Sequence, residues 1–319
     1  MKMIYRPMIF VFQGIIALVL SSVLLSEAMA AVREDSQPTM QVDFEQSSDF
    51  LSIKLAVDRL LAPGTPTEET REAVEALAAA ASSMAGDAAP PSRKIAAVRT
   101  VLYQPGPWND ERPFGYDHDD PLGRNLDNKL LATYLRTREG NCVSMPILFA
   151  ILAQKLGVDV SLSTAPAHVF VKFRDETGQI VNLETTSGAL PARDEWIAGQ
   201  MGVTDEAIEN GIFLKTMSAE ESAAVIAYTL VEQAMAERRY SDVHVVAEQL
   251  LEINPVFVEA LLATGSAWWG IIQTEFVEKY PDPNDIPSEL RPRLQHAYRQ
   301  NAAAFERAEA LGWREPQPE

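Results

Sequence analysis

The 319-residue sequence is poor in cysteine and in positive charge. Cys142 is its only cysteine, so a disulfide within the chain is excluded. Lysine and arginine number 27 against 45 acidic residues, a net charge of −18. Such an acidic surface repels phosphate backbones and anionic lipid, which disfavours nucleic-acid binding and peripheral membrane binding. The chain is nevertheless long and apolar enough to bury one large or two ordinary cores without metal or disulfide support.

The first thirty residues have the pattern of a signal peptide. Lys2 and Arg6 precede a mostly apolar stretch over residues 8–25, and a small-x-small cleavage site ends at Ala30. We therefore expect residues 1–30 to be removed from a periplasmic or secreted protein that keeps no membrane contact. The alternative is an uncleaved inner-membrane anchor, because the apolar stretch approaches the roughly 20 residues that span a bilayer.

The remaining chain is predicted to contain a linker and two folded regions. Residues 31–46 are polar and lack periodicity, which is typical of a linker. Residues 47–215 begin with helices and continue with strands, and residues 216–319 have a helical pattern throughout. The predicted fold class is α+β, with a central helix packed on a small antiparallel sheet, followed by an all-α region. The expected strands are Val158 to Ser163, His168 to Phe173 and Gln179 to Thr185.

The helical region resembles a short tetratricopeptide-like array. If Pro255 closes a 34-residue repeat, Gly265 and Trp268 fall on the small and aromatic positions of the next one. The alternative is a helical bundle that caps the first domain. In either case the region is a candidate surface for a protein partner. The expected helices are Ala223 to Arg239, Ser241 to Ile253, Val256 to Tyr280 and Pro287 to Leu311.

No metal or cofactor is predicted. The segment from Trp108 to Gly123 is an acidic loop in which His118 stands among aspartates, but it lacks a recognised ligand spacing. A solvated or substrate-side loop is the favoured interpretation. His244 and His296 lie on predicted C-terminal helices, where a solvent-exposed position is expected, so they receive no role.

The position of Cys142 indicates a reactive thiol. Exported proteins usually pair or avoid cysteine, so a retained single thiol is either reactive or buried and inert. Pro146 must occupy the first turn of the following apolar helix, which starts that helix at about Val143 to Met145. Cys142 is then held at the positive end of a helix dipole, which favours a thiolate and offers backbone amides to an oxyanion. Asn141 is a candidate for polarising a substrate carbonyl, although a cap or turn role is favoured.

A base and an acid are predicted from the pairing of two strands. His168 opens a strand next to a tight turn, where it can face a cleft. If the following hairpin has an odd loop, paired positions sum to 352, and His168 stands opposite Glu184 with Asn182 on the same face. Glu184 could then orient the imidazole, and Asn182 becomes a candidate substrate contact. An even loop would place Thr185 opposite His168 instead.

Three motifs in this order resemble the bacterial transglutaminase-like superfamily, in the branch that carries C-terminal tetratricopeptide-like helices. They are Gly140-Asn141-Cys142, Ala167-His168-Val169-Phe170-Val171 and Asn182-Leu183-Glu184-Thr185-Thr186-Ser187-Gly188. The likeness covers about Phe50 to Pro255 and implies a papain-like core. It implies Cys142 as nucleophile, His168 as base and Glu184 as third member, where the family usually has aspartate.

This resemblance implies acyl transfer from an amide of a peptide or protein through a thioester at Cys142. Water as the acceptor would make a hydrolase or peptidase, and an amine would make a transglutaminase. Some members of the branch lack the cysteine, so the alternative is a non-catalytic binding protein whose helices recruit a protein or cell-wall partner. Catalysis requires the Cys142 sulfur within about 4 Å of a His168 ring nitrogen, beside a cleft.

Overall fold

Three helices open the part of the chain that the computed structural model describes, residues 49–315. They are α2 (Phe50–Leu61), α3 (Thr67–Ala85) and α4 (Pro91–Tyr103). The proline at the start of α4 lacks an amide hydrogen that the first helical turn does not need. The predicted signal peptide and the predicted linker over residues 31–46 lie outside the described residues.

The segment between α4 and the central helix holds a very short parallel sheet. Its strands are β1 (Gly115–Tyr116) and β2 (Glu139–Gly140), and Tyr116 pairs with Gly140. Between them lie the rest of the acidic loop, a 3₁₀ turn η3 (Leu126–Lys129) and helix α5 (Leu131–Thr137). A second 3₁₀ turn, η2 (Pro107–Asn109), follows α4. This sheet joins the acidic loop to the residues directly before Cys142.

The central helix α6 (Ser144–Lys155) is buried on all sides over its first ten residues. Its side chains are apolar nearly all round, so no face is suited to solvent and the helix must lie inside a core. The helix stops before Gly157, whose φ of +71° favours glycine. The central position of this helix agrees with the sequence pattern. Its first residue, Ser144, lies within the predicted start at about Val143 to Met145.

A four-stranded antiparallel sheet packs against α6 in the order β3-β4-β5-β6. The strands are β3 (Val160–Ala165), β4 (His168–Arg174), β5 (Ile180–Glu184) and β6 (Leu190–Ala192). Three of these were expected. The fourth was not, because a three-residue strand with a central proline gives no alternating pattern. Two short helices follow, α7 (Asp194–Met201) and α8 (Asp205–Glu209).

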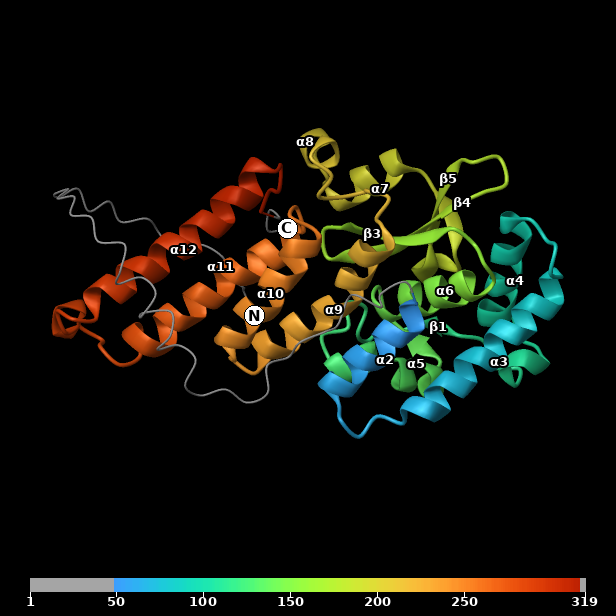
Figure 1. The fold of residues 1–319 in the computed structure, drawn as a ribbon, viewed down its shortest axis with the longest axis horizontal. Coiled ribbons are helices and arrows are strands. Elements are labelled where there is room, and N and C mark those ends of the chain that lie inside the picture. The colour runs from blue at the N-terminus through green and yellow to red at the C-terminus, as the bar shows by residue number, and fades with distance from the viewer. Residues whose placement is uncertain (1–48, 316–319) are drawn as a thin grey trace.

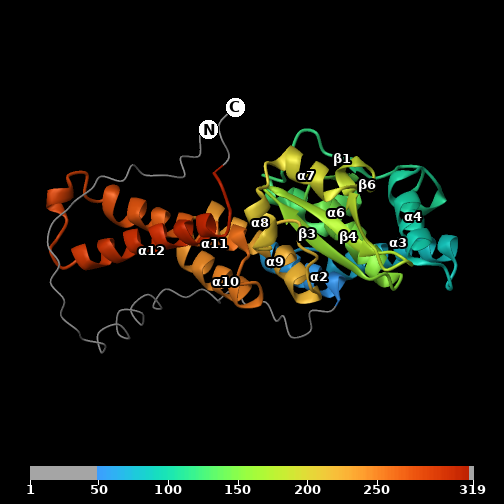
Figure 2. The ribbon, with the colours of Figure 1, turned by 90° about the horizontal axis from the view of Figure 1, so that it is seen from above.

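Four longer helices complete the described chain, each packed against its neighbour. Figures 1 and 2 show the last three extending away from the sheet. Among the described residues, no helix is long and apolar enough to cross a membrane. The helices are α9 (Ala219–Ala236), α10 (Tyr240–Ile253), α11 (Val258–Ile272) and α12 (Arg291–Ala310), with a π turn η5 (Gln273–Val277) and a 3₁₀ turn η6 (Pro283–Asp285) between the last two.

The first of these helices belongs to the core around α6 as well as to the helical region. Helix α9 contacts α2 and β3, and the Leu162 amide donates to the Ser222 hydroxyl at 3.1 Å. One hydrophobic core therefore continues from the N-terminal helices into α9 and α10. The fold is α+β with an all-helical C-terminal region, as the sequence predicted. The limits at residues 47, 215 and 216 and the tetratricopeptide-like repeat stay predictions.

Candidate active site

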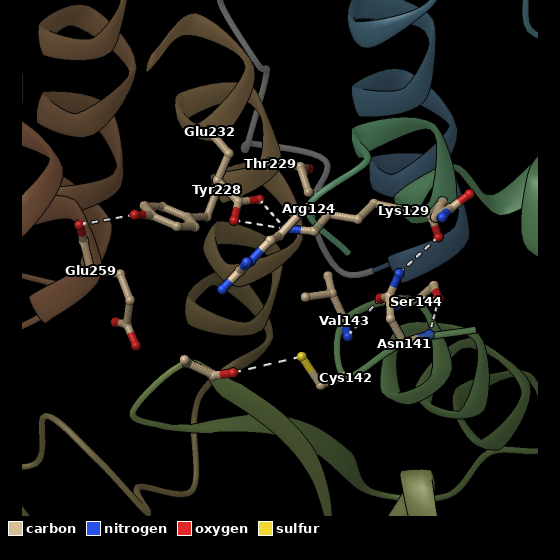
Figure 3. A network of polar contacts seen from close by, with 12 residues as sticks. Arg124, Lys129, Asn141, Cys142, Val143, Ser144, Tyr228, Thr229, Glu232 and Glu259 are labelled. Carbon is tan, nitrogen blue, oxygen red and sulfur yellow. Dashed lines mark hydrogen bonds and ion pairs between the residues drawn. The ribbon is translucent and has the colours of Figure 1, made fainter. Parts of the chain in front are cut away.

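Cys142 lies between β2 and α6, one residue before the helix cap at Val143. It is 3% exposed, and its Sγ donates to the Ala167 carbonyl at 3.6 Å, an interaction drawn in Figure 3. Its backbone N–H donates to the Pro121 carbonyl at 3.2 Å. The thiol is therefore at the helix start, as expected, but it is almost completely buried.

Asn141 caps the central helix. Its Oδ1 accepts from the backbone amides of Val143 at 3.0 Å and Ser144 at 2.9 Å, and its Nδ2 donates to the Asn128 carbonyl at 3.0 Å. Figure 3 shows this set of contacts beside Cys142. Because both Oδ1 and Nδ2 of Asn141 are hydrogen-bonded within the fold, this geometry fits the cap role rather than a free donor for a substrate carbonyl.

His168 follows a two-residue turn made by Pro166 and Ala167, and it pairs with Ala165. Ala167 has a φ of +55°, a left-handed conformation that a side chain other than glycine adopts at a cost. This turn directs the Ala167 carbonyl at Cys142 and places His168 beside it. The unusual backbone is thus adjacent to both candidate catalytic side chains.

Glu184 contacts His168, although the strand register differs from the predicted one. The Nε2 of His168 lies 2.7 Å from Oε2 of Glu184. Paired positions of β4 and β5 sum to 354, as in Val171 with Leu183, so the prediction that His168 stands directly opposite Glu184 was wrong by two residues. The odd loop was right, which keeps both side chains on one sheet face, and the long glutamate side chain reaches diagonally to the imidazole.

The loop explains the register. Gly178, with a φ of +86°, closes a three-residue loop that follows Asp175, and the Asp175 amide donates to the Gln179 carbonyl at 2.9 Å. A glycine in the left-handed region is typical of such a loop. The hairpin therefore closes at the Asp175 and Gln179 positions. The predicted register placed the closing pair one residue earlier on each strand.

Electrostatics favour a charged His168. Burial by itself lowers the pKa of His168, but hydrogen bonds with Cys142 and Glu184, together with their charges, raise the pKa to about 9. Burial raises the pKa of Glu184, but His168 and then Thr186 outweigh it and hold that pKa below its usual value. Thr186 donates its hydroxyl to Oε1 of Glu184 at 2.7 Å. The pair is therefore an imidazolium and a carboxylate at neutral pH.

Asn182 is not brought to the thiol. It shares the sheet face of Glu184, but its Nδ2 donates to the Ala192 carbonyl at 3.1 Å and to Asp194 at 2.7 Å. That places its amide in contacts between β5, β6 and the start of α7. Its proposed contact with substrate has no support from this geometry.

The described residues around the site offer no candidate metal centre. Within residues 49–315, no group of three or more histidine, cysteine, aspartate or glutamate side chains could hold a metal ion. A cavity of about 220 Å³ lies instead between α2, η3 and α9, lined in part by Leu61, Leu130 and Gln233. Residues that sequence reasoning missed are Tyr116 and Pro121 of the acidic loop, because nothing in their spacing marks them.

Comparison with known families identifies one region. Residues 68–219 match the model of the transglutaminase-like superfamily, from the start of α3 to the start of α9. No curated protein and no solved structure matches the chain. Residues 68–219 are therefore similar to transglutaminase-like domains, and α2 lies outside the match although it packs in the same core.

Proposed function

We propose that this transglutaminase-like domain is a cysteine hydrolase or acyltransferase that acts on an amide of a peptide or protein through a thioester at Cys142. One observation carries the proposal: Cys142 donates its Sγ hydrogen bond to the carbonyl of Ala167, the residue directly before His168, and His168 in turn lies 2.7 Å from Glu184. The influence of both Cys142 and Glu184 on the pKa of His168 agrees with this arrangement. A nucleophile, a base and an orienting acid in contact are the arrangement that thiol acyl transfer needs.

The proposed reaction has two steps. The Cys142 thiolate attacks the carbonyl carbon, the carbonyl electron pair moves to oxygen, and the collapse of this intermediate expels an amine that takes a proton from His168. A thioester remains. Water or a second amine then attacks the thioester, gives its proton to His168, and releases Cys142 as a thiolate. Glu184 stays ionised throughout, since His168 and Thr186 hold its pKa low.

A labelling experiment tests this proposal. Because Cys142 is the only cysteine, the mass of the intact protein reports its reaction with iodoacetamide directly. We expect His168→Ala to be labelled more slowly than wild type at pH 7, because the imidazolium that stabilises the thiolate is gone. His296→Ala, which changes a histidine of α12, is the matched control and should react like wild type.

Equal labelling of wild type and His168→Ala would contradict the proposal. It would favour the second candidate function, a non-catalytic binding protein whose helical region recruits a protein or cell-wall partner. The nearly complete cover over Cys142 is the observation that supports this alternative. Trp268, the aromatic position of the predicted repeat, lies against His244 with ring centroids 4.5 Å apart, so it contributes at least partly to helix packing.

We also propose that the protein is exported, on the pattern of residues 1–30. The measurement is the intact mass of the protein recovered from the periplasmic and membrane fractions. A mass lacking residues 1–30 in the soluble periplasmic fraction is expected. An uncut chain in the membrane fraction would favour the anchor.

A further inference from the structure

Two hydrogen-bond donors beside the Cys142 thiol converge on one oxygen atom. The Cys142 backbone N–H donates to the Pro121 carbonyl at 3.2 Å, and the Tyr116 hydroxyl donates to the same oxygen at 3.4 Å. Two donors aimed at one oxygen next to a nucleophile are the geometry that stabilises the oxyanion of acyl transfer. Here the oxygen belongs to the chain itself.

Other amides at the start of α6 are already used within the helix cap. Asn141 accepts from the Val143 and Ser144 amides through Oδ1 and from the Met145 amide through its backbone carbonyl. These contacts are local and would have to be broken to serve a substrate. The Cys142 amide differs, because its acceptor is on a separate loop and can be exchanged for another carbonyl.

Tyr116 is held in a fixed position relative to Cys142. The amides on either side of it donate to β2 and its flank, Gly115 to the Arg138 carbonyl and Asp117 to the Gly140 carbonyl, both at 2.7 Å. The short β1–β2 sheet therefore places Tyr116 beside Gly140, two residues before the nucleophile. This gives a physical reason for a parallel sheet of only two residues per strand.

The Tyr116 hydroxyl stays protonated and able to donate. Burial is the largest cause that raises its pKa, and the charges of Cys142, Glu184 and Asp117 raise it further. The Pro121 carbonyl that accepts from both the Tyr116 hydroxyl and the Cys142 amide places this hydroxyl beside Cys142. Its ring packs edge-on against His118 with centroids 5.2 Å apart, which holds the ring from its other side.

We infer that the Tyr116 hydroxyl and the Cys142 amide form the oxyanion hole of this domain, and that the Pro121 carbonyl occupies it until a substrate carbonyl displaces the loop. This inference rests on the proposed function. During attack the Cys142 sulfur bonds to the substrate carbon, and the carbonyl electron pair moves to the oxygen held by these two donors. When the carbonyl re-forms, the amine leaves with the proton of His168, and Tyr116 keeps its own proton.

The displaced segment is short and lies at the surface. Pro121 and Leu122 are exposed, whereas the turn behind them is held by Asp120, whose carboxylate accepts from the Arg124 amide at 2.7 Å and the Asn125 amide at 3.2 Å. The Pro121 carbonyl can therefore exchange its two donors for water while the turn stays in place. Its departure frees the Tyr116 hydroxyl and the Cys142 amide to bind a substrate carbonyl.

The test compares two reactions of the same thiol in Tyr116→Phe. Acetylation by p-nitrophenyl acetate passes through an oxyanion, whereas alkylation by iodoacetamide does not, and both are followed as mass added to the intact protein. We expect the variant to be acetylated about 100-fold more slowly, the usual effect of losing one oxyanion donor, and alkylated at the wild-type rate. Tyr134→Phe is the matched control, because the Tyr134 hydroxyl is buried without a hydrogen-bond partner among the described residues; both of its rates should equal those of wild type.

Two results would overturn the inference. Unchanged acetylation of Tyr116→Phe would mean that the hydroxyl does not stabilise the oxyanion. Equal slowing of both reactions would mean that Tyr116 only maintains the fold around the thiol. Failure of the proposed function is a separate outcome, since it is read from equal alkylation of wild type and His168→Ala.

Discussion

Replacing Glu184 with glutamine tests whether this carboxylate sets the charge of His168. The substitution removes the negative charge but keeps the length of the side chain and an oxygen that can accept from Nε2. Glutamine has only one such oxygen, so it cannot serve His168 and Thr186 in the way that the two carboxylate oxygens do. We expect the pKa of His168 to fall, so that the imidazolium beside Cys142 is less stable than in wild type.

The size of the effect follows from the raised pKa. The difference between the ordinary value of 6.5 and about 9 corresponds to roughly 3 kcal/mol of added stabilisation of the imidazolium. Cys142 and Glu184 together provide this and also offset burial, so an equal share leaves Glu184 with at least about 1.5 kcal/mol, about tenfold in proton affinity. Labelling of Cys142 by iodoacetamide at pH 7 should therefore slow by up to about tenfold.

Two measurements check this. The sequence has only four histidines, so NMR can follow the titration of each ring, and the midpoint of His168 should fall by about one pH unit. Glu139→Gln, an exposed carboxylate three residues before Cys142, is the matched control. An unchanged His168 midpoint in Glu184→Gln, or an equal shift in Glu139→Gln, would refute the reasoning.

The same pair makes stability depend on pH. The folded-state pKa of His168 lies above its unfolded value, so its contribution is fully present below pH 6.5 and is lost as the pH rises through about 9. We expect the free energy of unfolding to decline across this window in wild type and to decline less in Glu184→Gln. An identical slope in both proteins would contradict the assignment.

Three further predictions concern stability, each measured by chemical denaturation. Lys54→Met should destabilise the protein by about 3–5 kcal/mol, because it leaves the buried Asp58 without its ion-pair partner. Lys155→Met breaks a more exposed ion pair and should change the free energy of unfolding by less than about 1 kcal/mol. Equal effects of the two variants would contradict this. Burial raises the pKa of Glu259 to about 7. Glu259→Gln should therefore stabilise the protein increasingly from pH 4.5 to 7, by up to roughly 3 kcal/mol. A gain in stability that does not depend on pH would show that ionisation of Glu259 is not its cause. Ala167→Gly should stabilise by about 0.5–1 kcal/mol, because glycine adopts its positive φ without a steric cost, and a loss of stability would show that the turn carries no strain.

The sequence was sufficient to predict the central helix and the face shared by His168 and Glu184. Both depend on local rules: an apolar pattern with a proline in the first turn, and the alternation of side chains along strands. The register was wrong by two residues because it depends on the exact loop, which Gly178 sets through its positive φ. The predicted sheet face of each side chain was still correct, because a shift of two residues leaves every side chain on its face.

The residues around the thiol could not be predicted in the same way. Tyr116 reaches Cys142 through a sheet of two residues per strand, and so short an element has no period. Pro121 contacts the Cys142 amide through its backbone carbonyl, a group that every residue type carries. Contacts of this kind depend on tertiary structure alone, so the sequence could mark the acidic loop as substrate-side but could not assign a donor within it.

Burial of the His168–Glu184 ion pair favours the enzymatic proposal over the scaffold. The His168 and Glu184 side chains are 9% and 7% exposed. A buried ion pair usually stabilises a fold less than apolar residues of the same size would. In a protein with only a scaffold role, this buried ion pair would therefore give no gain in stability over apolar residues. An acyl-transfer enzyme needs it, because the same low-dielectric surroundings strengthen the interaction of the thiolate with the imidazolium and of the oxyanion with its donors.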